Sequence, residues 1–166
     1  MNPASLLRRG FLVLLLSAVC VAAATAHETR LSFAADRAAG HTALRQARDL
    51  VLFARSELEL KLDWTDASVR AVEDLAGSLH ADVRRRRAPP WEVAPLVEMI
   101  GSYVGEVLRR NHGAEWGWVT VNGKRVLGLK LAPTGTLFTP VETARRRVHQ
   151  GAASNLWLTY RAKAGL

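Results

Sequence analysis

The sequence contains a single cysteine, Cys20, which lies in an apolar run that we expect to be removed from the functional protein. An exported domain without cysteine has no disulfide and depends on packing alone. Metal-ligand pairs are missing as well. None of the histidines stands at helical or hairpin spacing from another; they occupy positions 27, 41, 80, 112 and 149. We therefore expect no zinc or iron site and no cofactor.

Catalytic motifs are equally scarce. No serine lies in a G-x-S-x-G elbow or in a Ser-x-x-Lys motif, and no glycine-rich loop is suited to hold a phosphate. The residues therefore favour a non-enzymatic function.

Lysine is also rare, with four residues against 19 arginines, and the full chain carries a net charge of +8. Loss of Arg8 and Arg9 with the N-terminus would leave 21 of the 23 basic residues against 15 acidic ones. A basic surface favours anionic partners such as a membrane, a polysaccharide or nucleic acid. Nucleic acid is excluded as a partner here because we expect the protein to be exported.

The expectation of export comes from the N-terminus. Arg8 and Arg9 precede an apolar run that ends in Ala24-Thr25-Ala26, the pattern of a signal peptide with an A-x-A cleavage site. A transmembrane helix needs about 20 apolar residues, more than residues 11–26 supply. We predict a cleaved signal peptide at residues 1–26 and a periplasmic or secreted protein. The alternative is a membrane anchor formed by residues 11–26, and the pattern leaves general and twin-arginine export open.

The remaining chain has the length of one domain. Residues 27–62 are expected to form an N-terminal helix and a connector, and residues 63–166 an α+β domain that packs with them.

Apolar residues at three- and four-residue steps predict about three helices in the first part of the chain. The first covers Arg37–Glu57. The second is capped by Asp63 or Thr65 and ends at Arg84–Arg87, before a proline pair. The third begins at Pro95, because proline is favoured in the first helical turn, and ends before Gly113.

A β-hairpin follows, because Asn122-Gly123 between apolar runs is typical of a type I′ turn. The two-residue loop places Trp118 opposite Leu127 and Gly117 opposite Gly128. One face is then apolar, whereas the glycine face is bare and must be covered by another element of the fold or by a partner. Leu137 and Phe138 are a candidate third strand.

Two C-terminal helices complete the chain. Thr139, Pro140 and Glu142 form a capping box for a helix that ends near Gly151, and a last helix covers Ala153 to Lys163. The fold class is therefore α+β, with helices on one face of a small sheet.

Two glycines inside the third helix stand out. Gly101 and Gly105 share one helix face, and an interior glycine costs about 1 kcal/mol relative to alanine. Close helix packing explains such a pair. A ligand held against the glycine stripe explains it as well, with Tyr103 and Glu106 at its edge.

Arginines cluster at two helices, Arg84, Arg85, Arg86 and Arg87 at one and Arg145, Arg146 and Arg147 at the other. The clusters could contact an anionic envelope component or a membrane surface. They are also what a solvated helix end carries to complement the helix dipole.

Cleavage after Ala26 would make His27 the mature N-terminus, combining an amine and an imidazole in one residue. Copper proteins use such an arrangement, so His27 is the one metal-ligand candidate.

The stretch Gly101-Ser102-Tyr103-Val104-Gly105-Glu106, followed by Trp116, resembles a family of small bacterial domains of unknown function. In that family a G-x-Y-x-G-E helix precedes a Trp-initiated hairpin and then a proline-started helix with a basic pair, here Pro140 and Arg146-Arg147. The resemblance spans Asp63 to Lys163. It implies an α+β fold and a shared role for Tyr103, Glu106 and Trp116, but no activity.

Three functions remain open. The first is an exported binding or accessory protein that recognises an unknown protein or an anionic envelope component. Its candidate residues are Gly101, Tyr103, Gly105, Glu106, Trp116, Gly117 and Gly128. The second is a secreted hydrolase or transferase using Glu106 with Tyr103 or a histidine, which a raised Glu106 pKa would support. The third is a toxin-neutralising or envelope-stress protein. The sequence sets no oligomeric state.

Overall fold

The computed structural model describes residues 31–166. The predicted signal peptide, Cys20 and His27 lie outside the described residues, so export, membrane anchoring and copper binding remain predictions. Among the described helices, none combines the length and the apolar composition that crossing a membrane requires.

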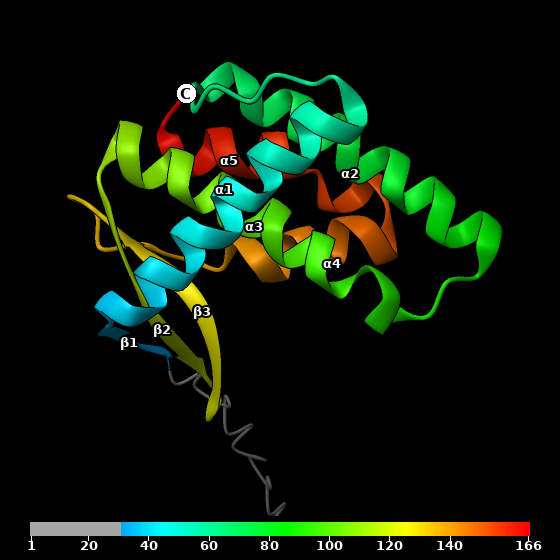
Figure 1. The fold of residues 1–166 in the computed structure, drawn as a ribbon. Helices are drawn as coiled ribbons and strands as arrows, with labels where there is room; N and C mark the ends of the chain where they lie inside the picture. Colours follow the sequence, from blue (N-terminus) through cyan, green and yellow to red (C-terminus); the bar gives the residue numbers. More distant parts are fainter. Residues whose placement is uncertain (1–30) are drawn as a thin grey trace, which may run out of the picture.

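Within residues 31–166, five α-helices and a four-stranded antiparallel sheet form the predicted α+β fold (Figure 1). The strands are β1 (Leu31–Ala35), β2 (Ala114–Val121), β3 (Lys124–Leu131) and β4 (Leu137–Phe138). The helices are α1 (Arg37–Leu58), α2 (Asp66–Arg86), α3 (Pro90–His112), α4 (Pro140–Gln150) and α5 (Leu156–Ala164), with a short 3₁₀ turn, η1 (Ala152–Ser154), before α5.

The hairpin has the predicted register. Gly117 lies opposite Gly128 and Trp118 opposite Leu127. Asn122 and Gly123 have φ angles of 50° and 82°, and a type I′ turn needs positive values at both positions. Local turn chemistry therefore sets the strand pairing.

β1 was not expected from the sequence. Its five residues, Leu-Ser-Phe-Ala-Ala, are weakly patterned, and the strand exists because it pairs with β2, where Phe33 lies opposite Val119. The pairing of β1 with β2 helps to explain why Gly117 and Gly128 have no side chains. A Cβ on Gly117 would lie 2.3 Å from the Ala34 carbonyl oxygen, and one on Gly128 would lie 2.5 Å from Val119 Cγ2. The chain's own atoms thus cover the face that the sequence left bare.

Two helix starts differ from the prediction. α3 begins at Pro90 rather than Pro95, because the second proline of the pair that ends α2 serves as the first residue of α3, where no N–H is needed. α5 begins at Leu156 rather than Ala153. Its start is set by Asn155, whose side-chain oxygen accepts a hydrogen bond from the Leu158 N–H at 2.8 Å.

α3 is the central helix, buried from Ile100 to Leu108 and packed against α1, α4 and the sheet (Figure 1). α1 meets it with small side chains, among them Ala43 and Ala47. The glycine stripe is filled in the same way. A Cβ on Gly101 would lie 2.3 Å from Val141 Cα, and one on Gly105 would lie 2.4 Å from Trp116 Cη2. Close packing, the first of the two explanations, therefore accounts for both glycines, and the stripe is not an open ligand surface.

Replacing Gly105 with alanine should test this packing. We expect Gly105→Ala to lower the free energy of unfolding by about 1–3 kcal/mol, because the new methyl group overpacks the contact with Trp116. Urea denaturation measures the change. Gly40→Ala is the matched control on α1, since its Cβ would lie 3.3 Å from Trp116 Cβ and only a small shift is needed. Equal effects of the two substitutions would show that Gly105 is not specially constrained.

Candidate functional site

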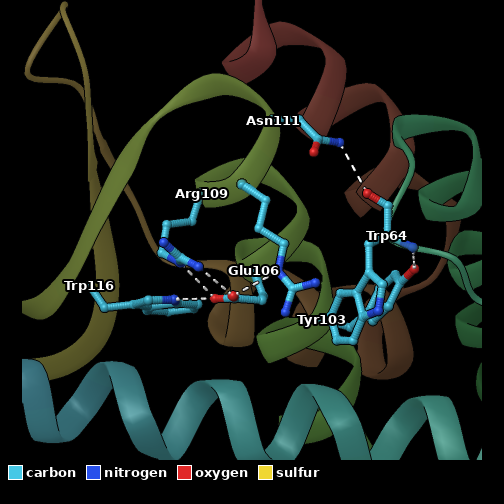
Figure 2. A network of polar contacts seen from close by, with 7 residues as sticks. Trp64, Tyr103, Glu106, Arg109, Asn111 and Trp116 are labelled. Carbon is cyan, nitrogen blue, oxygen red and sulfur yellow. Dashed lines mark hydrogen bonds and ion pairs between the residues drawn. The ribbon is translucent and has the colours of Figure 1, made fainter.

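Glu106, on α3, is the centre of a buried polar network (Figure 2). Its side chain is 1% exposed. The carboxylate accepts two hydrogen bonds from Arg109, at 2.9 and 2.7 Å, and one from Arg110 Nε at 2.9 Å. A fourth comes from the indole N–H of Trp116 on β2, at 3.2 Å. Helix α3 and the first long strand are thus joined through one ionised group.

The electrostatics of Glu106 favour its ionised form. Burial alone would raise its pKa, but the hydrogen bonds from Arg109, Arg110 and Trp116 outweigh burial and hold the pKa below its ordinary value. A general acid needs the opposite shift. The raised pKa that would support the hydrolase hypothesis is therefore not found.

Tyr103 belongs to a second group of contacts. Its hydroxyl accepts a hydrogen bond from the backbone N–H of Trp64 at 3.0 Å and forms another with Ser68 Oγ at 2.6 Å. The ring is fully buried and stacks on Trp64, with centroids 4.9 Å apart. Burial raises the pKa of the phenol. These contacts hold Trp64, whose φ of 67° is costly for a bulky residue.

Arg110 connects the two groups. Its guanidinium donates to Glu106 and lies 3.8 Å from the ring centroid of Trp64. Within residues 31–166, Tyr103 and Glu106 are not hydrogen-bonded to each other, and each has its own set of partners.

A third cluster surrounds Asp66 at the start of α2 and was missed by sequence reasoning. Its carboxylate accepts hydrogen bonds from the Tyr160 hydroxyl at 2.5 Å and from Asn111 Nδ2 at 2.7 Å. His112 Nε2 lies 3.0 Å away. Burial alone would raise the pKa of Asp66, but the hydrogen bonds from these partners outweigh burial and hold the pKa below its ordinary value. The cluster joins the end of α3 and the middle of α5 to the start of α2.

The networks are internally complete. Among residues 31–166, every buried side-chain nitrogen or oxygen has a hydrogen-bond partner. In the same part of the chain, no group of three or more histidine, aspartate and glutamate side chains is arranged to hold a metal ion. Buried polar groups in this region therefore join structural elements.

A pocket of about 500 Å³ opens beside the Glu106 network, between the first turns of α1, the end of α3 and the start of β2. Glu106 and Trp116, two of the predicted binding residues, are in its lining. The residues that line it are Asp36, Arg37, Gly40, His41, Leu44, Glu106, Arg109, Ala114, Glu115 and Trp116. The α1 residues among them were missed, because only tertiary packing brings α1 against β2. The capping residue Asp36 was the one local signal.

The charges in the pocket are unequally engaged. Asp36 accepts hydrogen bonds from the Ala38 and Ala39 backbone and from the Trp118 indole N–H, and Glu106 is saturated by its own partners. Arg37 and His41 are exposed at the rim. Arg109 uses Nε and Nη2 for Glu106. Glu115 is also in the lining, is exposed, and takes part in no side-chain hydrogen bond or ion pair within residues 31–166. The polar groups left for a ligand are therefore the side chains of Arg37 and His41 and the Glu115 carboxylate.

The two arginine clusters differ from each other. Arg84 to Arg87 are exposed at the end of α2, where Arg85 and Arg86 both pair with Asp82. Arg145 and Arg146 are exposed as well, and Arg145 pairs with Glu142. Arg147 does not belong to this surface.

Arg147 is 8% exposed and donates to Glu73 of α2 at 2.5 Å. Glu73 also accepts the backbone N–H of Leu156 at 2.7 Å and a hydrogen bond from Asn155 at 3.0 Å. The prediction that Arg147 lies in a basic patch was wrong, because it lies on the buried side of α4 with Ala144 and Val148.

The seven predicted binding residues separate into two places. Gly101, Tyr103, Gly105, Glu106 and Trp116 gather around α3, where the glycines and Tyr103 pack the core and Glu106 and Trp116 also reach the pocket. Gly117 and Gly128 lie on the other face of the hairpin, beneath β1 and Val119.

Comparison with known proteins found one family whose model matches part of the chain. Residues 79–160 match a domain of unknown function, DUF3806. The comparisons found no matching curated protein and no matching solved structure. The matched stretch takes in α3, β2 to β4 and α4, while α1 and β1 lie outside the match although they pack against it. The resemblance to an uncharacterised family is confirmed at this level. The G-x-Y-x-G-E motif and a bacterial origin remain predictions.

Glu106 should make stability depend on pH. Its pKa is lower in the folded protein than the ordinary 4.5, so its stabilising effect is complete above that pH and is lost as the pH falls through the folded-state value. We expect Glu106→Gln to cost about 1–3 kcal/mol at pH 7 and progressively less below pH 4.5. Denaturation curves at several pH values measure this. Glu142→Gln is the control, and a cost for Glu106→Gln that does not change with pH would contradict the assignment.

The buried position of Arg147 can be tested against its neighbour. Arg147→Ala should lower the free energy of unfolding by about 3–5 kcal/mol, because it leaves Glu73 buried without its countercharge. Arg146→Ala removes the same side chain from the exposed side of α4 and should change stability little. Thermal and urea unfolding of both variants measure the difference. Similar losses of unfolding free energy from the two variants would contradict the buried position of Arg147.

Proposed function

We propose that this chain is an exported, non-enzymatic binding protein whose ligand site is the pocket between α1, α3 and β2. The observation that carries the proposal is which groups of that pocket are already engaged. Asp36 and Glu106 accept hydrogen bonds from the protein, whereas Arg37, His41 and Glu115 are exposed. Arg37 is the exposed cation on which binding of an anion depends, and Glu115 opposes it.

The lining fits a small anionic ligand with an apolar part. Arg37 and Arg109 supply positive charge and N–H donors, His41 adds an imidazole, and an arginine can bind a carboxylate or phosphate through parallel hydrogen bonds. Leu44 and Trp116 supply the apolar surface. The Glu106 carboxylate holds Arg109 in one orientation, so the ligand does not have to order that side chain on binding.

Binding rather than catalysis is favoured by the state of the buried acids. The pKa of Glu106 is lowered and that of Tyr103 is raised, so near neutral pH Glu106 does not donate a proton and Tyr103 does not give one up readily. The expected role of Glu106 is to position Arg109 and Trp116.

Small carboxylates should bind in the pocket. In a titration of the ¹⁵N-labelled protein with benzoate or indole-3-acetate, we expect shifts of the Trp116 indole N–H and of the Ala114 and Glu115 amides. The neutral amides of the same compounds should give no such shifts. Arg37→Glu should weaken carboxylate binding by at least about tenfold, because it replaces attraction with repulsion.

Arg70→Glu is the matched control. It makes the same change of charge on an exposed residue of α2, outside the pocket. Equal weakening by Arg70→Glu would show that only net charge matters. Carboxylate shifts centred elsewhere, or none at all, would contradict the proposed site.

A further inference from the structure

The outer face of α1 carries a straight row of cations. Arg37, Arg48 and Arg55 are 11 and 7 residues apart, which places them on one line along a helix of 3.6 residues per turn. All three are exposed, and His41 and Arg45 are exposed beside them. At 1.5 Å per residue the row from Arg37 to Arg55 is about 27 Å long. We call these five residues, together with Leu52, the α1 outer face.

The arginines of this face lack the ion pairs seen elsewhere in the protein. Arg85 and Arg86 on α2 pair with Asp82 one turn away. No ion pair joins any of the four α1 arginines to a carboxylate of residues 31–166. Asp49 is exposed four residues after Arg45, but it forms no ion pair with the α1 arginines, and the face as defined carries four arginines and no carboxylate.

An apolar side chain lies within this row. Leu52 is four residues from Arg48 and three from Arg55, so it shares their face, and it is 65% exposed. A soluble polyanion would meet the arginines but gain nothing from Leu52. At a lipid surface, both kinds of side chain find partners, since arginines meet headgroup phosphates while a leucine enters the boundary of the acyl chains.

We propose that the α1 outer face docks on the surface of a bilayer that contains anionic lipids, with α1 lying in the plane of the surface. Its opposite side, including Leu50 and Ala54, stays packed in the core, so docking requires no unfolding. The pocket of the proposed function shares only Arg37 and His41 with this face. Arg48, Leu52 and Arg55 can therefore be changed without altering the pocket lining.

The test measures partitioning onto vesicles of phosphatidylglycerol and phosphatidylcholine, with pure phosphatidylcholine as the neutral comparison. It uses the exported protein with residues 1–26 absent, verified by N-terminal sequencing. If these residues are retained, a protease site before His27 removes them, because the apolar run would itself bind lipid. We expect binding only to the anionic vesicles, and we expect added salt to weaken it.

Three variants separate the lipid surface from simpler explanations. Each arginine near an anionic surface strengthens binding about fivefold, so Arg48→Glu/Arg55→Glu should weaken partitioning by at least about 25-fold. Arg70→Glu/Arg84→Glu makes the same change in net charge on exposed α2 residues that form no ion pair with the described carboxylates, and it should have a much smaller effect. Leu52→Ser should weaken binding to vesicles but leave binding to heparin, a soluble polyanion, unchanged.

Equal losses from the two double variants would overturn the proposal in favour of a net-charge effect. A Leu52→Ser protein that binds vesicles like the wild type, while heparin competes through Arg48 and Arg55, would identify the face as a polyanion site instead. Circular dichroism of each variant confirms that α1 remains folded.

Discussion

The contact between Trp116 and α3 is the constraint on which the site depends. The indole ring lies where a side chain at position 105 would otherwise be, and its N–H donates to Glu106 one residue further along the same helix. The apolar ring of Trp116 therefore packs on Gly105, and its N–H is hydrogen-bonded to the next residue of α3, Glu106. This contact fixes the distance between the sheet and the central helix, and with it the mouth of the pocket between α1, α3 and β2.

Hydrogen-bonded carboxylates serve the same purpose at three places, two of them buried and one, Asp66, half-buried. Glu106 joins α3 to β2, Glu73 joins α2 to α4 and to the start of α5, and Asp66 joins α2 to the end of α3 and the middle of α5. Removing an ionised group from water is costly, and several hydrogen bonds are needed to compensate for it. Each carboxylate accordingly has three or more donors close by. Such complete sets hold the helices in one arrangement, and they leave the less engaged cations at the surface, on α1 and around the pocket.

The hairpin and the proline-started α4 could be predicted from sequence because short-range rules govern them. Asn122-Gly123 determines the turn, the turn determines the register, and Pro140 is suited to the first position of a helix. β1 could not be predicted in this way, since Leu31–Ala35 becomes a strand only through pairing with residues 117–121. The site was partly predictable for a related reason. Glu106 and Trp116 are close in sequence, whereas Arg37 and His41 reach the pocket from a distant helix.

The arginines show most clearly what each level decides. The abundance of positive charge, the order of helices and hairpin, and the glycines on one face of α3 follow from the sequence alone, because composition, turn chemistry and helical periodicity are local properties. Packing between distant elements is what buries Arg147 against Glu73, while Arg85 and Arg86 pair with Asp82 and the α1 arginines face solvent without an ion pair to residues 31–166. The role of a charge depends on its distance from water and from opposite charges, and packing between elements far apart in the chain sets both distances.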